Sequence, residues 1–429
     1  MPSRRMRFAW FQSTNHPKYS LGRLLVQAVL ILSAAAATTG TAYAQTDRPD
    51  SVASEDEPPA LETSFRVYPT PLWTRSTGFA AGIRYAVRNI VLPHDRVLVI
   101  AKPGQHLGRY SATYFAGDPN RHALYGLVSG YYEDGGRRWY FGIGPSSSVN
   151  NRMAVEKTRL DVEVRLGLQP FDRRAFVQPV WSYQRHDVRD YASWNQGAFV
   201  RLDGPSQERL TAAVTGAPLE TNVYGLDAGI DLREGPGRRH RGALLQASAR
   251  RHTFPQSGRD AFDRYEVGAH LWIAFDQQRL SLRALTRLSD APLTVPFYLL
   301  PILDDRLLPG YAWYRFVGND LVAFTLEYAV PIFQFFEYAA MDAVLSAGAA
   351  SVYDDISEQF ESSISFEKTV TADRTAYPLR PSAAIGFELE SFTEDGWSTR
   401  VLLGWSPEGI RLVRFGFVHD LQSVQRNRR

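Results

Sequence analysis

The sequence contains no cysteine, so neither disulfide bonds nor thiolate metal sites can form. After residue 44 it has no apolar run long enough for a membrane-spanning helix, which takes roughly 20 residues. It also lacks an excess of charge of one sign. Beyond residue 44 there are 43 basic and 45 acidic residues, a balance that gives no positive field for nucleic acid and argues against that partner.

Residues 1–44 have the three parts of a secretory signal peptide. A leader with five basic residues and no acidic one precedes an apolar stretch at Leu24–Ala37, and the segment ends in the small-residue pattern of Ala42–Ala44. Because the apolar stretch is too short for a membrane anchor, we predict a cleaved signal. We interpret the acidic, proline-containing residues 45–60 as a linker, residues 61–420 as one domain and residues 421–429 as a basic tail.

What the domain has in abundance is alternation of apolar and polar residues. In Thr158–Leu168 every second residue is Leu or Val, and Phe324–Ile332 and Ser398–Trp405 alternate in the same way. Period two is the signature of a β-strand. About sixteen segments have the length of roughly 9–11 residues that a tilted bilayer-spanning strand requires. They begin near Ser64, Gly78, Arg96, Arg109, His122, Lys157, Ala175, Asn222, Arg241, Asp263, Arg279, Asp320, Tyr338, Pro381, Trp397 and Ile410.

The connections between these segments alternate in length. The even-numbered gaps are mostly tight, whereas several odd-numbered ones are long, at residues 134–156, 191–221, 289–319 and 351–380. Outer-membrane barrels alternate short periplasmic turns with long external loops, while a soluble β-sandwich has no reason to do so. We therefore predict an all-β fold, a closed transmembrane antiparallel up-and-down β-barrel of about 16 strands. Its apolar faces should point to lipid, and its lumen should hold Asp161, Glu163, Arg165, Asp227, Asp231, Glu327 and Glu388 as paired, partly hydrated groups.

One predicted long loop is unusually aromatic. Leu307–Phe316, LLPGYAWYRF, resembles the sixth external loop of the BamA/TamA-type bacterial surface antigens, the outer-membrane assembly and translocation barrels. That family motif is Leu-Arg-Gly-Phe/Tyr followed by Arg-Phe. The corresponding residues here are Leu308, Pro309, Gly310, Tyr311, Arg315 and Phe316. The stretches at 71–85, 139–145, 229–234 and 238–242 resemble further family signatures in the same order. The resemblance implies that the loop folds back into the lumen of its own barrel.

The chain departs from the family pattern at both halves of an ion pair. Pro309 replaces the loop arginine, and Ser346 replaces the aspartate that the family places on strand thirteen. The joint loss avoids leaving one charge buried without a partner. We predict that Arg315 takes over the anchoring of the loop, with Glu327 or Glu388 as its carboxylate partner, because a guanidinium binds a carboxylate in a two-pronged geometry.

The last predicted strand runs from Ile410 to about Asp420. Val413, Phe415 and Phe417 share its apolar face and resemble the C-terminal signal that assembly machinery reads in outer-membrane proteins. Together with the leader, this predicts location in the bacterial outer membrane.

The resemblance implies a role in outer-membrane protein insertion or export. Expected partners are outer-membrane lipids and unfolded outer-membrane protein clients, or a periplasmic protein that substitutes for the POTRA domains of assembly members, since residues 45–60 are too short for them. The alternative is a passive pore or structural surface protein that has lost the assembly role. We expect no enzymatic activity, no cofactor and no catalytic or metal site, because neither Gly-x-Ser-x-Gly nor His-Glu-x-x-His occurs.

Overall fold

The chain divides into two compact units, residues 1–52 and 53–429, and every described residue belongs to the second. The computed structural model describes residues 62–68, 82–92, 95–104, 108–117, 123–171, 174–190, 202–214, 217–234, 241–303, 307–312, 314–335, 339–368, 374–391, 398–412 and 417–418. The predicted signal peptide, linker and basic tail lie outside these ranges.

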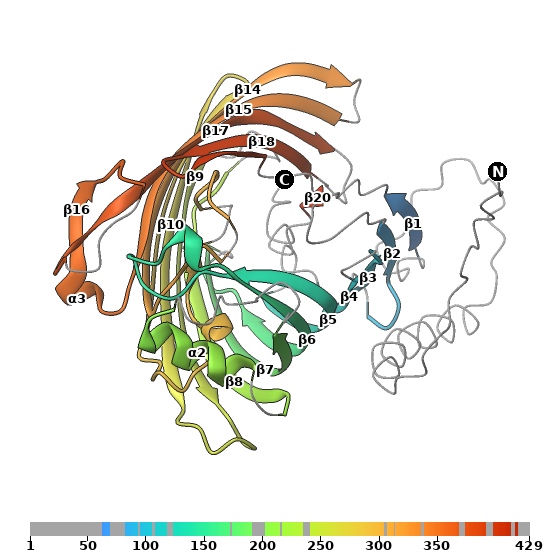
Figure 1. The fold of residues 1–429 in the computed structure, drawn as a ribbon. Helices are drawn as coiled ribbons and strands as arrows, with labels where there is room; N and C mark the ends of the chain where they lie inside the picture. Colours follow the sequence, from blue (N-terminus) through green and yellow to red (C-terminus); the bar gives the residue numbers. More distant parts are fainter. Residues whose placement is uncertain are drawn as a thin grey trace, which may run out of the picture. The chain divides into compact units, whose positions relative to one another are not determined.

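The second unit is built on one large β-sheet (Figure 1). Its wall is formed by β1 (Glu62–Tyr68), β2 (Gly82–Arg88), β3 (Arg96–Lys102), β4 (Gly108–Ala116), β5 (Leu124–Tyr140), β6 (Met153–Leu168), β7 (Ala175–Asp190), β8 (Leu219–Asp231), β9 (Gly242–Thr253), β10 (Phe262–Phe275), β11 (Gln278–Ser289), β14 (Asp320–Phe335), β15 (Ala339–Tyr353), β17 (Tyr377–Ser391), β18 (Ser398–Ser406), β19 (Gly409–Leu412) and β20 (Phe417–Val418). Each strand pairs antiparallel with the next one in this order as far as β19, and β20 pairs with β18.

Because β19 and β20 pair with the same neighbour, they share one position, and the described residues form sixteen strand positions, in agreement with the about sixteen that the alternation predicts. Each predicted strand start has a strand at or near it. The predicted closure is not observed: within the described ranges no ladder joins β1 to β19 or β20. No helix among the described residues combines the length and apolar character needed to cross a membrane.

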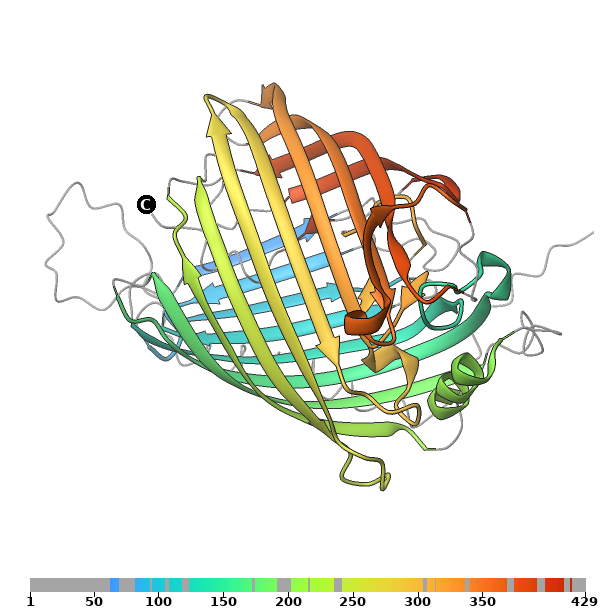
Figure 2. The ribbon, with the colours of Figure 1, turned by 90° about the vertical axis from the view of Figure 1, so that its left-hand side faces the viewer.

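The two faces of the wall differ as predicted. Large apolar side chains stand exposed at alternate positions, for example Leu166, Leu226, Val267, Phe324, Ile385 and Trp405. The intervening positions point to the concave face, which we call the lumen, and carry paired charges. Figure 2 shows how the strands curve around this face. Arg165 lies 2.7 Å from Glu163 and Arg250 lies 2.8 Å from Asp227, while Arg159 pairs with Asp161. A cavity of about 550 Å³ lies against this inner face, lined in part by Glu163, Arg165, Asp227 and Arg250.

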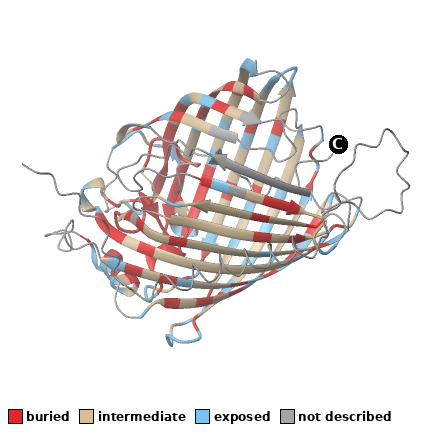
Figure 3. Ribbon diagram, turned by 90° about the vertical axis from the view of Figure 1, so that its right-hand side faces the viewer, coloured by how far each residue is buried: buried red, intermediate tan, exposed pale blue. Residues whose placement is uncertain are grey.

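Long connections occupy one end of the strands, which we call the long-loop end. They contain η1 (Val149–Asn151), α2 (Gly204–Val214), η5 (Phe297–Leu299), β12 (Ile302–Leu303), β13 (Phe316–Val317), α3 (Ile356–Gln359) and β16 (Phe360–Ile364). One prediction needs correction here: the connection expected at 134–156 is only 141–152, because β5 and β6 pair beyond the bulge between Glu133 and Gly136. Buried residues gather at this end (Figure 3), where an apolar cluster joins α2 and η5 to the tops of β5, β6 and β7.

Candidate functional site at the long-loop end of the lumen

The aromatic loop lies against the inner face of the wall. Leu307 and Leu308 are 3% and 0% exposed and belong to a buried cluster with inward-facing residues of β11, β14 and β15. Tyr311 and Phe316 complete this cluster, their ring centroids 5.1 Å apart. The loop is interrupted by Pro309 and Gly310, yet its aromatic and leucine side chains are buried against the inner face of the wall, and this burial stabilises it.

Gly310 makes the turn that brings the loop against β18. Its φ is +99°, a backbone conformation that side chains disfavour, and a Cβ there would lie 2.6 Å from the Trp405 backbone. The Ser406 hydroxyl donates a hydrogen bond of 3.1 Å to the Gly310 carbonyl oxygen. Pro309, the residue in place of the family arginine, is buried beside it. At this point the loop and β18 are in backbone contact, which only glycine permits.

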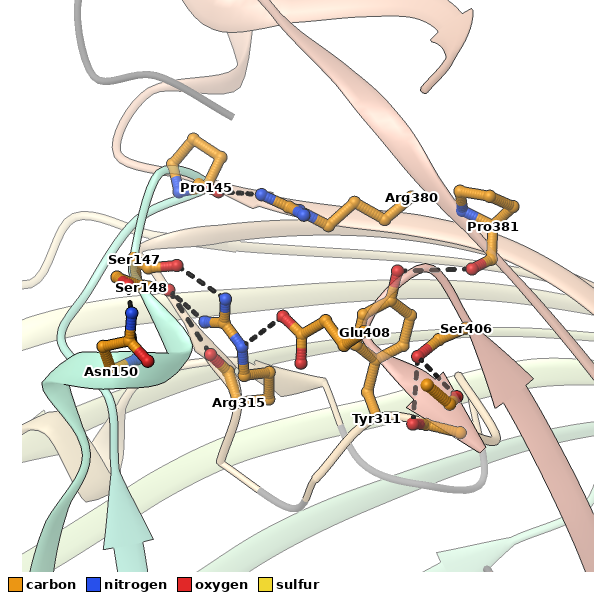
Figure 4. Close-up of polar contacts among 12 residues, drawn as sticks. Pro145, Ser147, Ser148, Asn150, Tyr311, Arg315, Arg380, Pro381, Ser406 and Glu408 are labelled. Atoms are coloured by element: carbon orange, nitrogen blue, oxygen red, sulfur yellow. Dashed lines mark hydrogen bonds and ion pairs between the residues drawn. The ribbon is translucent and has the colours of Figure 1, made fainter. Parts of the chain in front are cut away.

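Arg315 anchors the far end of the loop (Figure 4). Its Nε lies 2.6 Å from Glu408 Oε1, in the turn between β18 and β19, and both side chains are almost completely buried. Its two Nη atoms donate to Ser147 in the β5–β6 connection, Nη1 to Oγ at 2.7 Å and Nη2 to the carbonyl oxygen at 2.6 Å. Burial lowers the pKa of Arg315 to about 10, and Glu408 opposes that shift, so the guanidinium stays charged at neutral pH. We call Arg315, Glu408 and Ser147 the clasp.

A second arginine reinforces the clasp. Two guanidinium groups lie over the Phe316 ring, with Arg315 Cζ 4.4 Å and Arg380 Cζ 4.6 Å from its centroid. Arg380, on β17, also donates a 2.6 Å hydrogen bond to the Pro145 carbonyl oxygen. The Tyr311 hydroxyl donates to the carbonyl oxygen of Pro381 at 3.3 Å. The clasp joins the loop to the β18–β19 turn and the β5–β6 connection, and the contacts of Arg380 and Tyr311 join it to β17 (Figure 4).

The β5–β6 connection and α2 hold the remainder of the loop. Gly144 N, in the β5–β6 connection, donates to the Val317 carbonyl oxygen at 2.8 Å, which links this connection to the end of the aromatic loop. From α2, the buried Arg209 guanidinium donates to the carbonyl oxygens of Ala291, Pro292 and Val295 and to Asn319 Oδ1, at 2.9–3.0 Å. Arg209 therefore fixes both ends of the connection 290–319.

The predicted carboxylate partners of Arg315 are wrong. Glu327 and Glu388 instead bind Arg400 of β18, at 2.6 and 2.7 Å. Arg279 of β11 approaches the same two acids, at 3.8 and 3.2 Å. This four-charge network spans β11, β14, β17 and β18 inside the lumen. Both carboxylates of this network are neutralised by its two arginines, and Arg315 pairs with Glu408 instead.

Ser346, the residue in place of the family aspartate, stands beside this network. On β15 it lies opposite Glu327 on one side and Ala384 on the other, and it is 7% exposed. An aspartate here would add a further negative charge next to Glu327. The small uncharged side chain of Ser346 adds no such charge.

The predicted C-terminal signal is only partly described. Val413 and Phe415 lie outside the described residues. Phe417 belongs to β20, where its backbone pairs with Thr399. The role of the signal stays a prediction.

Three residues of the site had no signal in the sequence. Ser147 and Glu408 lie in connections of ordinary polar composition, and Arg380 lies at the edge of a predicted strand. Within the described part of the chain, no group of three or more His, Asp or Glu side chains is arranged to hold a metal ion.

The antiparallel wall, its apolar outer face and its polar lumen define a β-barrel of the type that spans outer membranes. Among solved structures the fold is similar to that of BamA from Haemophilus ducreyi lacking POTRA domains 1–3, with a TM-score of 0.52 and 12% identity over 82% of this chain and 68% of that one. CdiB from Escherichia coli is similar with a TM-score of 0.50 and 12% identity, over 86% of this chain and 62% of that one.

This likeness confirms the predicted resemblance to the BamA/TamA type at the level of the fold. The chain spans somewhat less than two thirds of the CdiB structure and slightly more than two thirds of the BamA structure. No family model and no curated protein matches the sequence.

Proposed function

We propose that this chain is an integral outer-membrane β-barrel that assists the insertion or export of other proteins. The observation that carries the proposal is the clasp, which binds an inward-folded loop to the β18–β19 turn through a buried ion pair. The family that the sequence resembles consists of assembly and translocation barrels, and the fold supports that comparison. In an outer-membrane barrel the long loops face the cell exterior and the short turns face the periplasm, so we assign the long-loop end to the exterior.

The proposed mechanism uses the edges of the wall. β1 and β19 are short end strands, of 7 and 4 residues, and an edge strand offers unpaired backbone groups to a partner strand. A client segment would pair with this edge by β-augmentation. The clasp holds the β18–β19 turn from inside the lumen. The last hairpin would therefore keep its position while the edge between β1 and β19 opens and pairs with a client strand.

Depletion in the producing bacterium tests the role. We expect a specific subset of outer-membrane or secreted proteins to fall, and wild-type protein to restore it. An Arg315→Ala variant that reaches the membrane normally should restore it poorly. Arg189→Ala is the matched control, because Arg189 is a largely exposed arginine paired with Asp187. An unchanged protein profile after depletion would contradict the proposal.

The alternative role is that of a structural surface protein, and the replacements at Pro309 and Ser346 favour it. A passive open pore is less well supported, because two buried clusters fill the long-loop end. Depletion that changes envelope integrity but no individual protein level would favour the structural role.

A further inference from the structure

An arm from the β15–β17 connection folds onto the outer face of the wall. The arm, residues 356–368, comprises α3, β16 and four following residues, and it projects beside the wall strands in Figure 1. Beneath it lies a buried cluster of Val322, Tyr353, Tyr377 and Leu379. Val322 lies two positions before Phe324, which is exposed on the apolar outer face, so both point outward. The arm therefore covers the outer face, away from the lumen.

The arm is held in place by regular contacts. β16 pairs in parallel with the start of β17, and Ser365 N donates to the Leu379 carbonyl oxygen at 2.9 Å. The Phe360 ring meets the Tyr353 ring edge-on, with centroids 6.0 Å apart. At the other end, Ile356 N donates to Asp320 Oδ2 at 2.9 Å. The side chains of the arm thus have fixed directions.

Three large apolar side chains of this fixed arm remain uncovered. Phe360, Ile364 and Phe366 are 41%, 51% and 67% exposed. Phe366 lies against Trp405 of β18, with ring centroids 6.4 Å apart. Trp405 is itself on the apolar outer face, next to the exposed Leu403. The apolar surface of the arm is therefore continuous with the apolar band of the wall.

We propose that the arm inserts Phe366 and Ile364 into the outer leaflet of the membrane as an interfacial anchor. Lipid is the occupant that the geometry favours, because the arm shares both the face and the apolar continuity of the strands that meet lipid. Phe366 and Trp405 lie near the end of β18, at the level where aromatic residues gather in the interfacial region. The exposed carboxylates of Glu358 and Glu367 supply the polar side that such an element needs.

The absence of native cysteine makes the test direct. Single variants Phe366→Cys and Ile364→Cys are labelled with a bimane fluorophore and reconstituted, as full-length protein, into phosphatidylcholine vesicles. Some vesicles carry lipid with a nitroxide near the headgroup, and iodide serves as the aqueous quencher. Glu358→Cys, an exposed position on the same arm, is the control.

At residues 364 and 366 we expect blue-shifted emission, several-fold stronger quenching by the nitroxide lipid than at residue 358, and protection from iodide. Free access of iodide at both positions, with no lipid quenching, would overturn the proposal. Protection from both quenchers would overturn it equally, since it would identify a protein surface, such as a second copy, as the occupant. Because both residues are largely exposed, the substitutions leave the fold intact, and the heat-modified gel mobility of each variant verifies this.

Discussion

At the scale of single residues, Gly310 shows how tightly the loop is fitted to the wall. Replacement by alanine places a Cβ at 2.6 Å from the Trp405 backbone and adds the strain of a positive φ. That strain alone costs about 1–3 kcal/mol. We predict that Gly310→Ala displaces the loop, measured as faster labelling of a cysteine introduced at Ala312, a partly buried residue of the loop.

Gly258 provides the matched control for this prediction. It also has a positive φ, of +62°, but a Cβ there meets nothing within 4 Å. Gly258→Ala should therefore leave the labelling rate at residue 312 unchanged. Equal rates in wild type, Gly258→Ala and Gly310→Ala would show that close approach to β18 does not position the loop.

The clasp pair gives a second prediction at this scale. Arg315→Ala leaves the Glu408 carboxylate buried without its cation, a change that typically costs about 3–5 kcal/mol. Urea unfolding in lipid or detergent, followed by tryptophan fluorescence, measures the loss. The double variant Arg315→Met/Glu408→Leu removes both charges and should recover much of it. A double variant no more stable than the single one would contradict an ion-pair role for Arg315.

Sequence reasoning at this scale found the cation and missed its partner. Arg315 was identifiable because it is the cation that remains in the family motif once Pro309 replaces the loop arginine. Glu408 was not, since an acid between Pro407 and Gly409 in a tight turn is normally solvated. Only the folded wall brings that turn over the loop, 93 positions away in the chain.

At the scale of elements, the strands were predictable and the small loop elements were not. The wall strands alternate because lipid and lumen select opposite residues, so each carries its own signal. α2 has few buried positions, namely Ser206, Arg209, Leu210 and Ala213, and its place depends on the contacts of Arg209 with a distant connection. β16 is held by β17 and carries no alternation of its own. Elements stabilised by tertiary contacts leave little trace in the local sequence.

The last strand carries a prediction at the same scale. Phe415 and Phe417, with Val413, resemble the C-terminal assembly signal. We expect Phe415→Ser/Phe417→Ser to reduce membrane insertion strongly, measured by the fraction of heat-modifiable protein in outer-membrane preparations. Substituting Gln425 and Arg426 in the tail by serine is the control and should have no effect. Normal insertion of the phenylalanine variant would exclude the signal role.

At the scale of the whole molecule, the wall and the loops contribute different properties. The wall presents an apolar band outside and paired charges inside, so it suits a bilayer. The connections 141–152 and 290–319 and the β18–β19 turn meet at the clasp and pack the long-loop end of the lumen. We propose that this loop blocks the long-loop end of the lumen, which distinguishes the barrel from a passive pore.

Single-channel conductance in planar bilayers tests that claim most directly. We predict low, rarely open conductance for the wild-type protein, longer and more frequent openings for Arg315→Ala and Gly310→Ala, and wild-type behaviour for Arg189→Ala. A wild-type protein that conducts steadily as a wide pore, unchanged by Arg315→Ala or Gly310→Ala, would contradict it.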